Sequence, residues 1–175
     1  MSITLRPFTR EEYHDFWQRY VPDPIMVPRP YRYQQEHVEC SFRYDQTCRD
    51  WYPVFGIFTE VGAAVGSLSL KRIDHQKSQC ELGIMMVDDR CKNRGYGTEA
   101  IRQAIRMARE EYGLARLLAD TMGSNLRMQH ILDKLGFRFL ERTPNVYDMN
   151  GRMEDRLDYV LDLTKEEKGL CILWH

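Results

Sequence analysis

Lys92-Asn93-Arg94-Gly95-Tyr96-Gly97-Thr98 is the segment that decides the fold. An apolar run typical of a buried strand ends at Val87 shortly before it, and residues with helical spacing follow from Gly95. Glycines let the backbone turn tightly and approach a ligand closely. The start of a helix also offers unpaired N–H groups and a partial positive charge. We therefore expect the segment to bind a pyrophosphate on its main-chain amides, with Lys92 and Arg94 adding charge and Thr98 a hydroxyl.

Other interpretations of this segment have to be weighed. The glycines could form only a turn beside solvated basic residues. A Walker A loop is excluded because no Gly-Lys-Ser/Thr follows. A dinucleotide fingerprint stays open, since Gly95 to Ala100 matches G-x-G-x-x-A and Asp120 stands near the spacing of a ribose-binding acid. Residues 88–94 separate the strand from the first glycine, however, so an NAD-linked oxidoreductase is the less favoured interpretation.

The rest of the chain alternates between strand and helix patterns. Val21 to Pro30 holds four prolines and must be an irregular loop. Turns are expected at Gly62 and at Asn150-Gly151, and Gly136 should end a helix. The periodicity predicts strands at 2–9, 52–60, 63–73, 78–88, 114–121, 137–147 and 153–163, and helices at 10–20 (capped by Thr9), 31–50, 95–112 and 125–135. This order describes a mixed α/β domain.

Composition narrows the class of protein. The chain has 175 residues, of which 43% are apolar and 29% charged, as in an ordinary globular domain. A net charge of −1 argues against a nucleic-acid partner. We see no signal peptide and no apolar run near the ~20 residues that span a membrane. The five cysteines are scattered without a C-x-x-C pair, which predicts no disulfide framework, no metal site and a cytoplasmic location.

Two blocks together resemble the GNAT superfamily of N-acetyltransferases. The first is the pyrophosphate motif Q/R-x-x-G-x-G/A, here Lys92 to Gly97, with Lys92 in place of Gln or Arg. The second is a helix that begins at Asn125 and ends in Lys134-Leu135-Gly136-Phe137. The Thr98-Glu99-Ala100 ending and the second block look most like the ribosomal-protein N-terminal, or Rim-type, branch.

The resemblance implies a fold and a co-substrate. It implies one acyl-CoA N-acyltransferase domain over residues 1–175, with a core at 3–163 and a tail at 164–175. Its α/β fold would be a single mixed, mostly antiparallel sheet flanked by helices and splayed between the fourth and fifth strands. Acetyl-CoA would lie in the splay. The residues implied to bind it are Met86, Val87 and Asn125 for the pantetheine arm, and Lys92, Asn93, Arg94, Gly95, Tyr96, Gly97 and Thr98 for the pyrophosphate.

The implied reaction is the direct attack of a primary amine, from a protein N-terminus or a small molecule, on the thioester in a ternary complex. Glu81 is the candidate base, unless it is a solvent-facing strand residue paired with a lysine or arginine. Leu132 stands where many superfamily members carry a tyrosine that protonates the leaving thiolate. This departure keeps a second hypothesis open, a non-catalytic acyl-CoA-binding module.

Two further segments are open to more than one interpretation. The aromatic residues of segment 13–52 either wall an acceptor site or pack as core. The apolar stretch from Leu170 to Trp174 would dock on the domain or on a second subunit, so a homodimer is one expected assembly.

Overall fold

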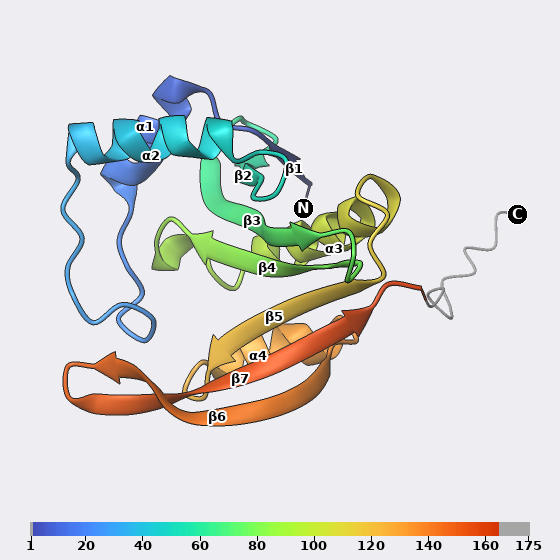
Figure 1. Ribbon diagram of the computed structural model, residues 1–175. Helices are drawn as coiled ribbons and strands as arrows, with labels where there is room; N and C mark the ends of the chain where they lie inside the picture. Colours follow the sequence, from blue (N-terminus) through green and yellow to red (C-terminus); the bar gives the residue numbers. More distant parts are fainter. Residues whose placement is uncertain (1, 165–175) are drawn as a thin grey trace, which may run out of the picture.

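A single seven-stranded sheet organises the chain (Figure 1). The computed structural model describes residues 2–164, so the apolar tail discussed above lies outside the described residues. The strands are β1 (Ile3–Arg6), β2 (Val54–Thr59), β3 (Ala64–Asp74), β4 (Gln79–Met86), β5 (Arg116–Met122), β6 (Arg138–Met149) and β7 (Arg152–Asp162). They lie in the order β1-β2-β3-β4-β5-β7-β6, and every neighbouring pair is antiparallel except β4 with β5. The predicted mixed, mostly antiparallel sheet is confirmed.

The parallel pair β4 and β5 separates halfway along its length. Gln79–Leu82 pairs with Arg116–Ala119, and the ladder between the two strands stops there. Beyond that point the strands diverge, and Figure 1 shows the opening between them. The predicted splay between the fourth and fifth strands is confirmed. Among the described residues it leaves the facing edges of residues 83–86 and 120–122 without a strand partner, while their other edges stay paired with β3 and β7.

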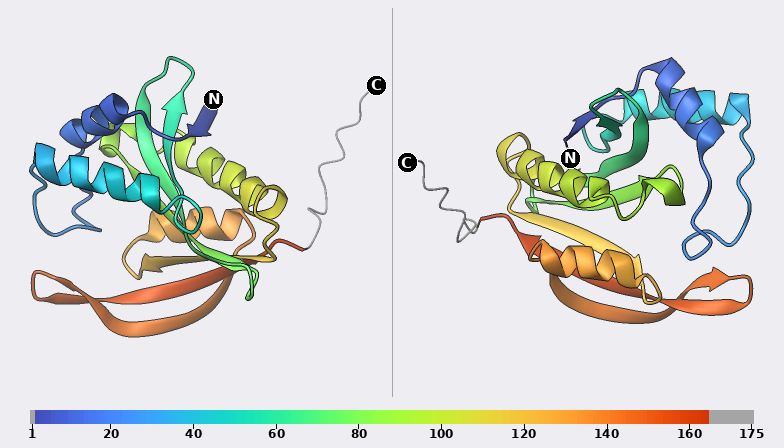
Figure 2. Two further views of the ribbon diagram at one scale, coloured as in Figure 1. Left: turned by 45° about the horizontal axis from the view of Figure 1, so that its top comes forward. Right: turned by 180° about the vertical axis from the view of Figure 1, so that it is seen from behind.

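Helices cover both faces of the sheet. They are α1 (Arg10–Arg19), α2 (Gln35–Thr47), α3 (Tyr96–Glu110) and α4 (Leu126–Lys134), with a 3-10 turn, η1 (Asp89–Cys91), after β4. Seen from behind, α3 and α4 lie in front of the sheet (Figure 2). Helices α1 and α2 pack on the opposite side, where α1 contacts both α2 and β3. Thr9 caps α1 as predicted, because its hydroxyl accepts from the Glu12 N–H while Glu12 bonds the Thr9 N–H.

Helix α2 begins one turn later than the sequence predicts. Tyr31 was expected inside this helix, but the chain is extended up to Gln34, whose side chain makes no capping bond. The ring of Tyr31 packs instead on Trp17 and Tyr20, with centroid distances of 5.5 and 5.3 Å. Tertiary packing of one aromatic side chain therefore outweighs the local helical pattern.

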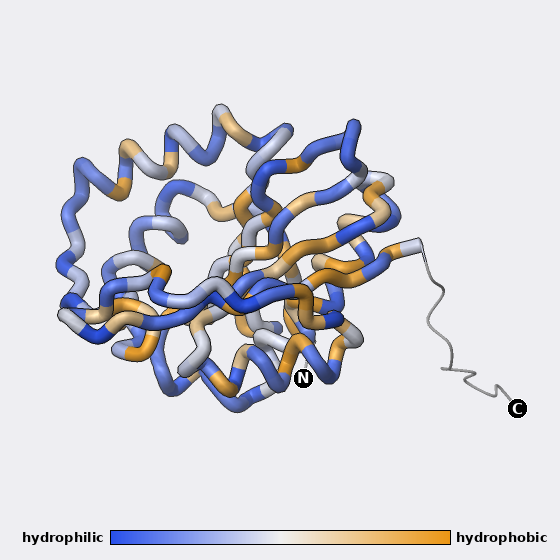
Figure 3. Tube along the Cα trace, turned by 60° about the horizontal axis from the view of Figure 1, so that its bottom comes forward, coloured by the Kyte–Doolittle hydropathy of each residue, from blue (hydrophilic) through white to orange (hydrophobic). Residues whose placement is uncertain are grey.

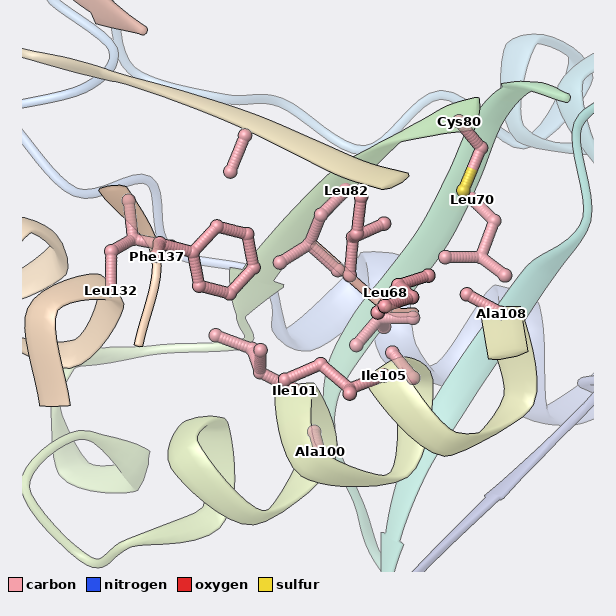
Figure 4. Close-up of a cluster of buried hydrophobic side chains, with 14 of the residues drawn as sticks. Leu68, Leu70, Cys80, Leu82, Ala100, Ile101, Ile105, Ala108, Leu132 and Phe137 are labelled. Carbon is pink, nitrogen blue, oxygen red and sulfur yellow. The ribbon is translucent and has the colours of Figure 1, made fainter. Parts of the chain in front are cut away.

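The main core lies between α3 and the centre of the sheet. The predicted apolar stripe of α3 is buried, and Figure 4 shows Ile101 and Ile105 pointing toward Leu68 and Leu82 of the strands. Burying a side chain of this size stabilises the fold by roughly 1.5–3 kcal/mol. Hydrophobic stretches gather in the middle of the molecule, and its outer loops are hydrophilic (Figure 3). Among the described residues no helix is long and apolar enough to cross a membrane.

Candidate active site

The first turn of α3 lies beside the diverging end of β4. Gly95 caps the helix at φ +81°, and the first helical bond runs from the Glu99 N–H to the Gly95 carbonyl at 3.0 Å. The N–H groups of residues 96–98 therefore have no acceptor within the helix. A methyl group placed on Gly97 would lie 3.8 Å from Cδ1 of Ile84 and 3.9 Å from Sδ of Met86. The predicted pyrophosphate segment and the open part of the sheet are thus neighbours.

The side chains of this segment have different surroundings. Arg94 and Asn93 are exposed, Thr98 is half-buried, and the ring of Tyr96 packs against the main core. Lys92 is only 11% exposed, and its ammonium bonds Asp89 and, at 2.5 Å, Asp23. The Lys92 charge is therefore neutralised within the protein. Arg94 is the exposed cation that the segment offers to an anion.

The main chain of β4 has free hydrogen-bonding groups on the side of the splay. The Val87 N–H donates to the Val65 carbonyl at 2.9 Å. This bond shows which residues of β4 direct their main-chain groups toward β3. Hydrogen-bonding direction alternates along an antiparallel strand, so Ile84 and Met86 point their N–H and C=O groups toward β5. The Val87 carbonyl already accepts from Val21 N–H at 2.8 Å. Of the two predicted arm-binding residues at this end of β4, Met86 has main-chain groups without a strand partner among the described residues, and Val87 has both groups in use.

Two hydroxyls without partners lie on the β5 side. Thr121 Oγ1 and Ser124 Oγ are buried and have no hydrogen-bond partner among the described residues. Sequence reasoning missed both residues, although a hydroxyl at the end of a buried strand and another just before Asn125 were visible signals. Asn125 itself caps α4, accepting from the Met128 N–H at 3.2 Å, and its amide nitrogen lies 3.1 Å from Sδ of Met26. Both polar atoms of its side chain thus contact the protein, and its contact with the arm stays a prediction.

The loop at residues 21–30, called the bridging loop below, spans the mouth of the splay (Figures 1 and 2). On the β4 side it is held by the Val21 bond to Val87 and by the Asp23 ion pair with Lys92. On the other side Met26 meets Asn125, and the Pro28 carbonyl accepts from the Asn150 side chain at 3.0 Å. The predicted irregular, proline-rich segment is confirmed.

A cavity of about 340 Å³ lies on the α1/α2 face of β4, opposite α3. Three of the aromatic residues of segment 13–52, namely Tyr13, Trp17 and Tyr52, line it. The cavity also reaches β4 at the point where the splay begins. In it the Tyr13 hydroxyl donates to Asp45 Oδ2 at 2.9 Å. Burial raises the pKa of both side chains. The cavity is lined by Tyr13, Trp17, Ser41, Asp45, Tyr52, Val54, Ser67, Ser69, Lys71, Gly83, Ile84 and Met85.

Glu81, the predicted base, lies just outside this lining. It is still in the paired part of β4, opposite Leu118, and its carboxylate bonds Arg72 at 2.8 Å. Its surroundings match the alternative interpretation of a strand residue paired with an arginine. Leu132 is fully buried in the core beside Phe137 (Figure 4), so the position of the expected tyrosine is a packing position here.

Comparison with known proteins agrees with this geometry. The family described as acetyltransferase (GNAT) domain matches residues 2–138. A probable acetyltransferase of known structure superposes with a TM-score of 0.80 at 19% identity, covering 91% of this chain and 92% of that chain. A search of curated protein sequences finds no match.

Two further solved structures are from Vibrio cholerae. Mutant forms of the spermidine/spermine N-acetyltransferase SpeG give a TM-score of 0.77 at 15% identity, covering 93% of this chain and 96% of that one. A proposed ribosomal-protein-serine acetyltransferase gives 0.72 at 21% identity, covering 91% and 93%. At these identities the likeness concerns the fold.

The splayed sheet, the open helix N-terminus and the family match define an acyl-CoA N-acyltransferase fold. The chain belongs to the GNAT family of acetyltransferases and is an N-acetyltransferase.

Proposed function

We propose that the protein transfers the acetyl group of acetyl-CoA to a primary amine by direct attack in a ternary complex. The observation that carries this proposal is the combination of a β4 edge without a strand partner beyond Leu82, among the described residues, with two buried hydroxyls without partners in or just after β5. Buried polar groups are almost always hydrogen-bonded, so orphan groups on both sides of a gap favour a polar ligand between them. An amide-containing arm fits this requirement.

The residues present fit acetyl-CoA along the length of the splay. We assign the pyrophosphate to the amides of residues 96–98 with Arg94 beside them, and the arm to the main chain of Ile84 and Met86 with Thr121 and Ser124 opposite. Bound acetyl-CoA supplies an acetyl thioester as the electrophile. Because the splay closes at Leu82, the thioester end lies toward Ile84, where the cavity on the other face begins. The Ile84 N–H is then a donor available to the acyl oxygen.

The acceptor amine has to reach this cavity in its neutral form. For a lysine-like amine with a pKa near 10, only a fraction of about 10⁻³ is neutral at pH 7, which is a deficit of about 4 kcal/mol. For an α-amine with a pKa of ~8, the pKa lies only about one unit above this pH. The first kind of acceptor needs a base more than the second. Glu81 would have to leave Arg72 to act, and Asp45 is the carboxylate that already lines the cavity.

The test is acetyl-CoA consumption with a panel of primary amines, measured as released thiol and as N-acetylated product. Amine-dependent turnover supports the proposal. Binding of acetyl-CoA without turnover on any amine would favour a binding module instead. The same assay on Glu81→Gln and Asp45→Asn, run as pH–rate profiles, separates the two carboxylates. The base is the residue whose removal abolishes the rising limb of the profile.

A further inference from the structure

Lys71 places a positive charge inside the cavity. It lies on β3, next to β4, and is half-buried. Its stem lies flat across Gly83, because a methyl group at Gly83 would be 2.4 Å from its Cε and 2.9 Å from its Nζ. A side chain at position 83 would displace the ammonium, so the glycine makes room for it. The charge therefore stands one residue from Ile84, at the closed end of the splay.

The ammonium of Lys71 has no ion-pair partner among residues 2–164. Glu81 is its cross-strand neighbour, but that carboxylate is turned to Arg72. Asp45 lines the same cavity and already accepts a hydrogen bond from Tyr13. The ammonium is therefore available to pair with an anionic group of a ligand in the cavity.

A second donor, on another residue of the lining, is also unmatched. The indole N–H of Trp17 is buried and has no hydrogen-bond partner within the described part of the chain. The Tyr13 hydroxyl lies close to it without the geometry of a hydrogen bond. Lys71 and Trp17 are thus both donors, one of them cationic, and the hydroxyls of Ser41, Ser67, Ser69 and Tyr52 in the same lining can also donate. Their complement is an anionic group with more than one oxygen.

We propose that the acceptor carries a carboxylate next to its amine, as a free amino acid does, and that Lys71 and Trp17 bind this carboxylate. The proposal rests on the N-acetyltransferase function proposed above. In the reaction the amine nitrogen forms the new C–N bond, the C–S bond breaks, and the proton lost by the amine ends on the thiol of CoA. The products are an N-acetylated amino acid and CoA.

The size and charge of the cavity agree with such an acceptor. About 340 Å³ is at the small end of the range for small-molecule sites. A carboxylate held over Gly83 keeps the neighbouring amine close to Ile84, where the thioester is assigned. A polycationic acceptor would instead approach the unpaired ammonium of Lys71, and like charges repel.

The experiment compares three acceptors that share one side chain: free methionine, its C-terminal amide, and the corresponding amine without the carboxyl group. We expect kcat/KM for the free acid to exceed that of the other two by about 10- to 100-fold, the range for a charged hydrogen bond. Lys71→Met should remove this preference by lowering kcat/KM for the acid alone. Trp17→Phe should lower it by about 3- to 10-fold while keeping the ring.

Matched controls keep the result interpretable. Lys77→Met removes a 69%-exposed lysine from the same hairpin and should leave all three rates unchanged. Lys71→Arg restores the charge, and thermal stabilisation by acetyl-CoA confirms that each variant is folded. Preference of the wild type for the amide or the decarboxylated amine overturns this proposal alone, as does an equal loss on all three acceptors in Lys71→Met. Turnover of no amine at all, with acetyl-CoA still bound, overturns the proposed function as well.

Discussion

Substituting Gly97 by aspartate should separate folding from cofactor binding. Gly97 is the second residue of α3, and a Cβ atom there meets its nearest neighbour at an ordinary 3.8 Å. Glycine in a helix costs about 0.8–1 kcal/mol relative to alanine, and a carboxylate in the first turn gains about 0.3–1 kcal/mol from the helix dipole. We expect free Gly97→Asp protein to be as stable as the wild type, or more stable by up to about 1 kcal/mol.

Binding should change in the opposite direction. A carboxylate about 5 Å from a pyrophosphate charge costs about 3 kcal/mol at an effective dielectric constant of 20, which raises Kd about 150-fold. At an acetyl-CoA concentration of 100 times the wild-type Kd, stabilisation by the ligand falls from about 2.7 to about 0.3 kcal/mol. In a domain of this size the Tm shift then drops from about 5–10 °C to about 1 °C.

The assay is thermal unfolding with acetyl-CoA, CoA and NADH. Gly97→Ala is the matched control, since it adds the Cβ atom without the charge and should keep most of the shift. Gly95 is less suitable for this purpose, because its φ of +81° would strain any side chain. An aspartate variant that keeps the full acetyl-CoA shift would refute the assignment of the pyrophosphate to this helix. A Tm shift of the wild type with NADH alone would favour the dinucleotide-binding interpretation instead.

Two further predictions concern Thr121 and Glu12. Thr121→Val removes a buried hydroxyl without a partner among the described residues, so the free energy of unfolding of the ligand-free protein should change by less than about 1 kcal/mol. Acetyl-CoA affinity, measured by calorimetry, should fall about 3- to 10-fold. Unchanged affinity would remove Thr121 from the site. Arg6 holds the pKa of Glu12 at about 2, below the ordinary 4.5, so the stability it contributes is complete above pH 4.5 and is lost as the pH falls toward 2. Glu12→Gln, at a partly exposed position, should therefore cost on the order of 1 kcal/mol at pH 7 and nothing near pH 2 in denaturant unfolding; a difference independent of pH would contradict this linkage.

The fold could be predicted because its signals are local. The apolar stripe of α3 repeats at helical spacing and is buried as expected. Glycines mark the places where the backbone needs a left-handed conformation, at Gly62 in the β2–β3 turn and at Gly136 after α4. The short parallel contact between β4 and β5 follows from the family resemblance, and the register of the strands confirms it.

The contacts of the side chains in the site depend on residues far away in the chain. A local sequence motif does not contain this information. Lys92 is a predicted phosphate-binding residue, and the sequence pattern does not show that Asp23, 69 residues earlier, forms an ion pair with it. Asn125 has the sequence of a helix cap and also of a ligand-binding residue; the structure shows the cap, and the second role stays a prediction. The cavity collects residues from α1, α2, β3 and β4, so the position of Lys71 over Gly83 could not be foreseen from either strand alone.

The bridging loop gives a physical reason for four prolines in ten residues. Two strands that diverge have no ladder to hold them at a fixed separation, so the width of the splay must be set by other bonds. The loop supplies them by bonding Val87 and Lys92 on the β4 side and Asn125 and Asn150 on the other. Each proline fixes its own φ, which reduces the entropy lost when the loop is ordered across this gap. The loop therefore links the two sides of the splay where the β4–β5 ladder has ended.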